Sequence, residues 1–328
     1  MEIEQFTPDD ADALRAWVEV HNAVRRHDSP WKHPLTEHEA AGALRFGWDL
    51  EVDVPFLGSH DGQVVGTAAY GASQYDNLHL AFVEVFVLPE HRRRGHGGTL
   101  FEAMVEQVRG LGRTSVLTGG WESDAARGFA AAHGLEQKSV EVNRRQVLAE
   151  LDWAELDRLH AESVERAAAY DIAALPVPTP DDQLAVLAEV AASINDAPTD
   201  DLDIEDEVYS AERMRAYETA MGRREIRLHR LVARHRETGA LAGQTVMAVD
   251  GERPELAEQH DTTVAGSHRG HRLGTLLKLD MLRRLRETEP QLTTIDTWNA
   301  ESNDFMVGVN ETMGYRAVGR ALDFQKSL

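Results

Sequence analysis

The sequence of 328 residues contains no cysteine. Disulfide bonds, thiolate metal sites and cysteine nucleophiles are therefore excluded together, and this absence favours a cytoplasmic location. No apolar run approaches the roughly 20 residues that a membrane-spanning helix needs, so we expect no membrane segment. The chain is acidic from its second residue, which predicts neither a signal peptide nor a transit peptide.

Positive charge is also scarce. Asp and Glu total 56 against 34 Lys and Arg, which leaves a net charge of −22. A nucleic-acid partner is therefore not expected, because binding to phosphates needs a basic face. A cationic substrate such as an amine fits this charge, and simple colloidal solubility explains it as well. The histidines show no metal-ligand spacing on a single helix, so no metal site is predicted.

One stretch has the pattern of a phosphate-binding turn. An apolar β-type run through Val87 and Leu88 stops at a proline, and a helical pattern opens at Thr99. The turn between them consists of Arg92, Arg93, Arg94, Gly95, His96, Gly97 and Gly98. Glycines let the backbone approach an anion, and the first N–H groups of a helix are free donors. The arginines add positive charge beside them.

The second half of the chain repeats this plan 177 positions later. The residues that recur at this offset are Gly62, Gly66, Val87, His91, Arg92, Gly97, Leu100 and Trp121, matched by Gly239, Gly243, Val264, His268, Arg269, Gly274, Leu277 and Trp298. At this length such a repeat indicates two copies of one domain.

The second turn departs from the first at one position. After a strand that ends at Val264, it contains Arg269, Gly270, His271, Arg272, Leu273 and Gly274, and Thr275 follows. Arg272 stands where the first turn has Gly95. Its side chain either obstructs a bound pyrophosphate, or the residue is helical and its guanidinium wraps the phosphate.

The first turn resembles motif A of the GNAT acyltransferases, whose R/Q-x-x-G-x-G/A signature is met by Arg92, Gly95 and Gly97. The resemblance extends over nearly the whole chain and identifies it as a tandem, actinobacterial-type member. It implies an α+β fold in which each copy has a central mixed, mostly antiparallel sheet flanked by helices and splayed where CoA inserts. We expect an N-terminal domain at 1–150, a connector helix at 151–169 and a C-terminal domain at 170–328.

The run that follows Trp298 resembles GNAT motif B. By that resemblance Asn299 and Asn303 reach the pantetheine arm of the cofactor. The family often has a tyrosine four residues before the closing glycine, where it protonates the departing thiolate. Here that position holds Asn310, and Ala130 in the first copy. Asn310 either hydrogen-bonds the sulfur or packs inside the helix, and it is a poor proton donor at neutral pH.

Acetyl transfer to an amine needs a base and a donor for the carbonyl oxygen. In the family that donor is a backbone N–H, here near Val87 or Val264. Glu84 and Asp261 lie three residues before these positions in their own copies, which suits a base. A strand carboxylate that merely faces solvent remains the alternative. His79 and His260 are weaker candidates for the base.

The resemblance therefore implies an N-acetyltransferase that moves an acetyl group from acetyl-CoA to a primary amine of a small molecule by direct attack. The alternative is that one or both domains bind CoA or another small ligand without catalysis. We expect a monomer or a homodimer. The acidic, irregular segment 196–207 is predicted to be a solvated loop or a lid edge beside the acceptor pocket.

Overall fold

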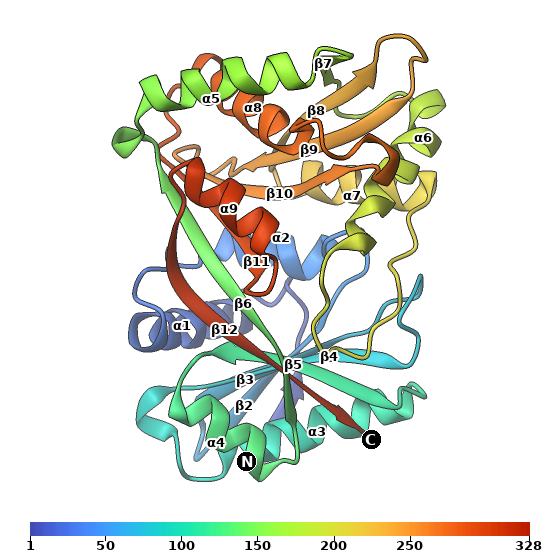
Figure 1. Cartoon of the computed structure of the whole chain (residues 1–328). Coiled ribbons are helices and arrows are strands. Elements are labelled where there is room, and N and C mark those ends of the chain that lie inside the picture. The colour runs from blue at the N-terminus through green and yellow to red at the C-terminus, as the bar shows by residue number, and fades with distance from the viewer. The chain divides into compact units, whose positions relative to one another are not determined.

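The computed structural model describes residues 1–328, which form two compact units (Figure 1). The first unit comprises Met1–Glu141, Thr199–Asp206 and Gly319–Leu328, and the second comprises Val142–Pro198 and Glu207–Val318. Each unit is therefore assembled from separated segments, whereas the predicted domains 1–150 and 170–328 are contiguous. None of the helices is both long and apolar enough to cross a membrane.

The first unit is a mixed sheet with helices on both faces. Its strands lie in the order β1-β2-β3-β4-β5-β12, and all adjacent pairs are antiparallel except β4 and β5. The strands are β1 Glu2–Gln5, β2 Val54–His60, β3 Gln63–Gly71, β4 Leu80–Val87, β5 Ser115–Trp121 and β12 Arg316–Ser327. The helices are α1 Ala11–Asp28, α2 Glu37–Phe46, α3 His96–Gly110 and α4 Asp124–Ala132.

Alternation along the strands assigns these helices to the two faces. Val83 of β4 is buried in one cluster with Leu100 and Met104 of α3. Ala69 of β3 is buried in another, with Trp17 of α1. Because successive side chains of a strand point to opposite faces, α3 and α1 cover opposite sides of the sheet.

The second unit has the same plan. Its strands lie in the order β7-β8-β9-β10-β11-β6. They are β6 Glu136–Val147, β7 Tyr170–Leu175, β8 Arg227–His235, β9 Leu241–Val249, β10 Leu256–Val264 and β11 Thr294–Ala300. The helices are α5 Trp153–Arg166, α6 Asp181–Ala191, α7 Ala211–Arg223, α8 Leu273–Thr288 and α9 Asp304–Thr312.

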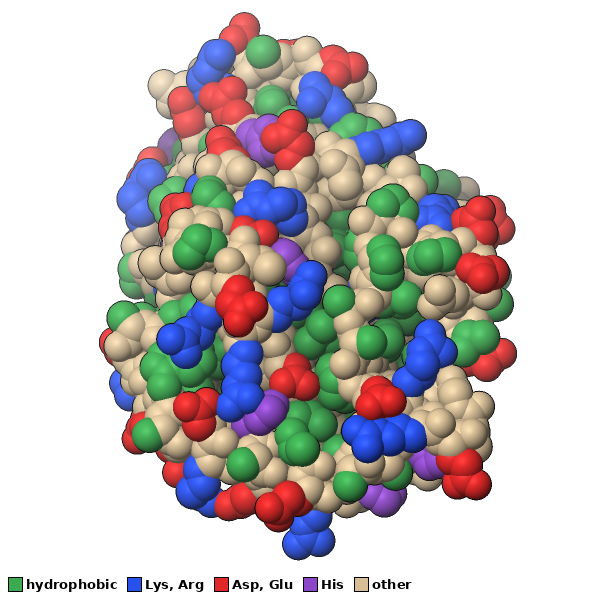
Figure 2. All heavy atoms as spheres, turned by 90° about the horizontal axis from the view of Figure 1, so that it is seen from above, with side chains coloured by type: hydrophobic (Ala, Val, Ile, Leu, Met, Phe, Trp, Pro, Cys, Tyr) green, Lys and Arg blue, Asp and Glu red, His purple; other side chains and the backbone are tan.

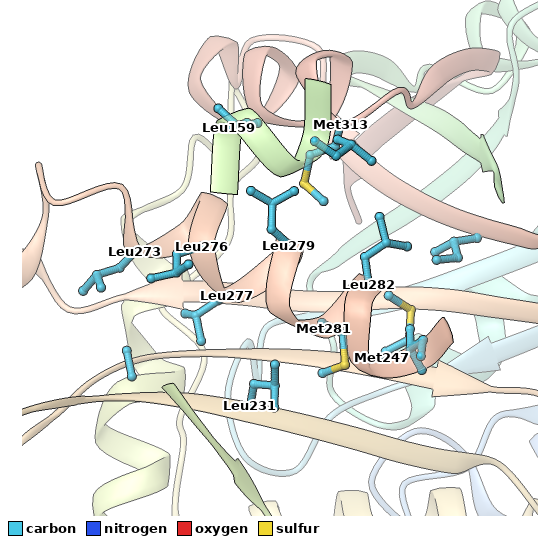
Figure 3. Packing of buried hydrophobic residues seen from close by; sticks show 14 of the residues in the cluster. Leu159, Leu231, Met247, Leu273, Leu276, Leu277, Leu279, Met281, Leu282 and Met313 are labelled. Atoms are coloured by element: carbon cyan, nitrogen blue, oxygen red, sulfur yellow. The ribbon is translucent and has the colours of Figure 1, made fainter. Parts of the chain in front are cut away.

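Helix α8 is the centre of the core of this unit (Figure 3). Leu277 and Met281 point toward the sheet, where Leu231 lies, and Leu279 points toward Leu159 of α5. All of these side chains are less than a tenth exposed. Their burial accounts for the apolar periodicity of α8 on more than one face.

The last strand of each sheet comes from an unexpected part of the chain. β6 follows α4 of the first unit, yet its second half belongs to the second unit, where β6 lies next to β11. β12 follows α9 of the second unit and pairs with β5 of the first, from Ala321↔Trp121 to Ser327↔Ser115. The two halves of the sequence thus exchange their final strands.

The acidic segment is irregular, as predicted, but residues 199–206 are anchored on the first unit. The backbone N–H of Glu205 donates to Asn77 Oδ1 at 2.7 Å, and that of Asp203 donates to Gln325 Oε1 at 2.8 Å. Ser139 Oγ donates to Asp200 Oδ2 at 2.8 Å. This part of the segment therefore has defined partners and is not simply a solvated loop.

Candidate functional site

Each sheet opens between its two parallel central strands. β4 pairs with β5 only from Leu80↔Ser115 to Phe82↔Leu117, although both strands continue beyond these pairs. β10 and β11 likewise pair only from Leu256↔Thr294 to Glu258↔Asp296. Past these points the facing backbone groups have no strand partner. The expected splay of the sheet is therefore present in both units.

The peptide at the end of each open strand faces this gap. Leu88 donates its N–H to the carbonyl of Val65 on β3 at 2.9 Å. Hydrogen-bonded and non-hydrogen-bonded pairs alternate in an antiparallel ladder, so the preceding residue, Val87, turns its N–H and C=O away from β3. Ala265 bonds Ala242 in the same way, which turns Val264 toward the opening of the second unit.

An arginine holds that peptide in place in both units. Arg92 Nε donates to the Val87 carbonyl at 3.1 Å, and its two terminal nitrogens donate to Asp28 at 2.9 and 2.6 Å. Arg269 Nε donates to the Val264 carbonyl at 3.1 Å and pairs with Asp196 at 2.5 Å. The predicted cofactor-binding side chains of both arginines are thus engaged with the protein and fix the strand end.

The two turns share one backbone conformation despite their different sequences. Residues 93 and 95 of the first turn have φ of +62° and +89°, and residues 270 and 272 of the second have +85° and +56°. In the first turn the glycine is residue 95, and in the second turn it is residue 270, so it occupies a different one of the two positions in each turn. Arg272 is therefore left-handed and not helical, and its guanidinium bonds Glu162 at 3.0 Å.

Helices α3 and α8 begin directly after these left-handed residues, and no side chain caps either of them. Six other α-helices are capped by a side chain, those of Asp10, Thr36, Ser123, Asp152, Ser210 and Asn303. The first N–H groups of α3 and α8 are therefore left for a ligand, at the positive end of the helix dipole. This arrangement fits a pyrophosphate group.

The remaining residues of the turns divide into backbone contributors and packing residues. His96 and Leu273 are the first residues of α3 and α8, and both side chains are buried. Arg94 and His271 are exposed. Residues 97, 98, 99, 274 and 275 lie in the first turn of each helix. A Cβ at Gly97 would lie 3.4 Å from Phe129, an ordinary contact.

The predicted strand acids, Glu84 and Asp261, occupy equivalent places in the open strands. Both side chains are half-buried, and neither carboxylate has a hydrogen bond or an ion pair. Asp261 lies in a bulge of β10, where the register shifts between Gln259 and Thr262. Bulges of this kind redirect a side chain and are frequent beside active sites.

Burial raises the pKa of both acids toward neutrality. The pKa of Glu84 lies at about 7, mainly from burial and further from the nearby Asp53 carboxylate, against a smaller opposing effect of Arg25. The pKa of Asp261 lies at about 6 through burial and Glu207, with Arg230 opposing. A carboxylate with such a pKa suits general-base catalysis near pH 7.

Each strand acid has another acid and an arginine among its charged neighbours, and neither neighbour could be predicted from the sequence. Asp53 and Glu207 lie at unrelated places in the two halves of the chain, as do Arg25 and Arg230. They emerge as neighbours only once the chain is folded. The weaker histidine candidates have other partners, since His79 bonds the Asp203 carbonyl and His260 bonds the Tyr217 hydroxyl at 2.7 Å.

The motif B asparagines have three different surroundings. Asn303 caps α9 by accepting the N–H of Met306 at 3.2 Å. Asn310 is 0% exposed and donates to Asn299 Oδ1 at 2.6 Å. Asn299 is half-buried near the end of β11, in the part that has separated from β10. Of the three, it is the one on the strand that borders the opening.

Charges of both signs are interspersed over the face drawn in Figure 2. No group of three or more His, Cys, Asp or Glu side chains is arranged to hold a metal ion.

The candidate site in each unit combines three features described above. They are an opening in the sheet, an uncapped helix at one end of that opening and a carboxylate on the open strand.

The model of the acetyltransferase (GNAT) family matches residues 17–135. Among solved structures, a tandem GNAT protein from the clavulanic acid biosynthesis pathway, solved without acetyl-CoA, is 26% identical. The match covers 99% of this chain and 98% of that chain with a TM-score of 0.81. No match was found among curated proteins.

Two more distant structures share the fold. A GCN5-related N-acetyltransferase from Sphaerobacter thermophilus is 15% identical, with 99% of this chain and 95% of that chain covered and a TM-score of 0.69. A glucosamine N-acetyltransferase region of a fungal multi-domain GH3 β-N-acetylglucosaminidase is 14% identical, with 98% and 38% covered and a TM-score of 0.68. The predicted fold class and its duplication are therefore confirmed.

Proposed function

We propose that this chain transfers an acetyl group from acetyl-CoA to a primary amine of a small molecule. The match of the GNAT acetyltransferase family model to residues 17–135 and the tandem GNAT fold support this function. One observation carries the proposal. In each unit an unpartnered carboxylate of raised pKa lies on the same open strand that leads to an uncapped helix.

The turns would hold the cofactor through their backbones. The first N–H groups of α3 and α8 would bind the pyrophosphate, and the exposed Arg93 and Arg94 would add positive charge in the first unit. The strand edges in the opening would bind the amides of the pantetheine arm. When bound, acetyl-CoA supplies the thioester whose acetyl group is transferred.

The protein's own groups would then perform the proton transfers. Glu84 or Asp261 would take the proton of the incoming ammonium, so that the amine attacks as a free base. The N–H of Val87 or Val264, a residue whose carbonyl accepts from the nearby arginine, would donate to the thioester carbonyl oxygen where negative charge develops. The amine nitrogen would form its bond to the carbonyl carbon as the carbon–sulfur bond breaks. CoA would leave as a thiolate, and the proton that the nitrogen loses as the amide forms would go to that thiolate.

Binding without catalysis is the second candidate for either unit. The position four residues before the glycine that follows α4 or α9 is Ala130 in one unit and the fully buried Asn310 in the other. Neither side chain protonates a thiolate efficiently. Under this alternative, a unit would bind CoA tightly and show no turnover on any amine.

A matched pair of variants tests cofactor binding by each unit. Gly97→Glu and Gly274→Glu place a carboxylate in equivalent helix starts, where the added Cβ meets no atom closer than 3.4 Å. We expect calorimetric titration with CoA to show one fewer site in each variant and none in the double variant. Gly97→Ala controls for the side chain itself and should bind normally. CoA binding that is unchanged in the double variant would remove both turns from the proposed site.

Transfer is tested on a panel of small amines by thiol release. We expect turnover by the wild-type chain and a loss of turnover in the glycine variant of whichever unit is catalytic. Tight CoA binding with no turnover on any amine would favour the binding function over the transferase.

A further inference from the structure

A lysine is buried behind the opening of the second unit. Lys278, on the second turn of α8, is 3% exposed, and its Nζ donates to Asn310 Oδ1 at 2.7 Å. The same ammonium lies 5.0 Å from the ring centre of Tyr315. The Nδ2 of Asn310 in turn donates a hydrogen bond to Asn299 Oδ1 at 2.6 Å. Three side chains thus link the interior to the edge of β11.

The lysine determines the direction of every hydrogen bond in this chain. An ammonium group only donates, so Asn310 must present its oxygen to Lys278 and its NH₂ group to Asn299. Asn299 must then accept with its oxygen. Its own NH₂ group has no partner in the structure. Orientations of isolated amides are otherwise ambiguous, but here the donor-only lysine decides both.

We propose that Lys278 is a positioning residue that fixes Asn299 as a hydrogen-bond donor toward the opening of the second unit, for a carbonyl oxygen of the pantetheine arm of an acyl-CoA. The proposal rests on the proposed function for the identity of the ligand. It adds that the second unit binds the cofactor, and it assigns a role to a residue outside both motifs.

The first unit has no such chain. The residue at the repeat offset from Lys278 is Phe101, which is 0% exposed and packs edge-on against Phe129 at 5.7 Å. Ala130 takes the place of Asn310. The strand pairs Ala81↔Val116 and Ala257↔Ile295 make Gly120 of β5 the counterpart of Asn299, and glycine has no side chain to donate. The two units therefore differ in how they would contact the same ligand.

The substitution Asn310→Asp reverses the last link without changing the shape of the side chain. An aspartate accepts at both oxygens, so it still accepts from Lys278 but also requires a donor from Asn299. The Asn299 amide then turns over and presents its oxygen to the opening. The folded state gains a buried Lys–Asp pair, so we expect the free energy of unfolding to stay unchanged or rise.

The test measures CoA affinity by calorimetry in the full chain at about pH 6, where the ammonium is charged because burial lowers the pKa of Lys278 only to about 7. In the Gly97→Glu background only the second unit binds, and Asn310→Asp should weaken binding there by about 10-fold to 100-fold. In the Gly274→Glu background only the first unit binds, and the same substitution should leave the affinity unchanged.

Each other outcome overturns the inference. Equal affinity in the Gly97→Glu background would show that Asn299 does not bind the cofactor, while the proposed function would stand. Weaker binding in both backgrounds would show a general loss of structure. Absence of CoA binding by the wild-type chain would remove the proposed function as well. If Asn310→Asp does not fold, Asn299→Ala leaves the Lys278–Asn310 pair intact and should show the same selective loss.

Discussion

Replacing each strand acid by its amide should lower acetyl transfer while stabilising the fold. The pKa of Glu84 lies at about 7 against an ordinary 4.5, and that of Asp261 at about 6 against 3.8. Each pKa unit corresponds to about 1.4 kcal/mol, so ionising either carboxylate costs the folded state about 3 kcal/mol. Solvent contact of these half-buried groups reduces the cost to about 1–2 kcal/mol.

The sign of the effect follows from proton binding. The folded state holds these protons to a higher pH than the unfolded chain does, so the free energy of unfolding falls as pH rises between the unfolded and folded pKa values. For Glu84 the loss is complete a little above pH 7. Glu84→Gln and Asp261→Asn remove the ionisation, so each should be more stable than wild type by about 1–2 kcal/mol at about pH 8.

Urea unfolding at about pH 4 and pH 8 measures this difference, which should nearly vanish at the acidic end. Thiol release on a reactive amine measures the activity, which should fall by about 10²-fold to 10⁴-fold in the variant of the catalytic unit. A variant that loses stability at both pH values would show that the carboxylate is a structural partner. Full activity in the double variant would show that neither acid is the base.

Three further outcomes follow from the geometry. Arg272→Gly, which relieves a left-handed φ of +56° on a residue with a side chain, should raise the free energy of unfolding by up to about 1 kcal/mol in a urea titration, and a decrease would show that the Glu162 contact matters more. Arg92→Met frees the Val87 carbonyl and should lower kcat/KM by about 10-fold to 100-fold if the first unit is catalytic, without changing the number of CoA sites. A fragment ending at residue 150 lacks β12 and should fail to give a cooperative unfolding transition by circular dichroism, whereas a sharp transition would show that β5 needs no partner.

The parts of the structure that were predictable from sequence are those that depend on neighbouring residues. The strand, turn and helix around Gly95 follow from local conformational preferences, and the same plan around Gly274 follows from the repeat. A helix, α5 (Trp153–Arg166), lies within the range predicted for the connector, and it packs in the core of the second unit. The prediction for Arg272 failed in its helical form because both turns have positive φ at two positions, and the second turn has glycine only at 270, which leaves a residue with a side chain left-handed at 272.

The parts that were not predictable depend on long-range contacts. The acid beside Glu84 precedes β2, and the acid beside Asp261 ends the irregular acidic segment, so no spacing rule relates either pair. The predicted alternatives for Asn310 were contact with a sulfur atom or packing in a helix, and its bond to Lys278 depends on two helices meeting. The sequence pattern of a strand also does not identify the strand with which it pairs. The pattern of β12 therefore predicts only the last strand of the C-terminal half.

The pairing of β5 with β12 also has a consequence for synthesis of the chain. Domains of a growing chain generally fold from the N-terminus, at about 5–20 residues per second. The partner of Ser115–Trp121 is made much later, because the pairs run to Ser327 of β12. With 327 − 121 = 206 residues between the ends of the two paired segments, the edge of β5 waits roughly 10–40 seconds for that strand. An unpaired strand edge invites pairing with other chains, so nascent copies on one messenger RNA are at their most vulnerable to aggregation in this interval.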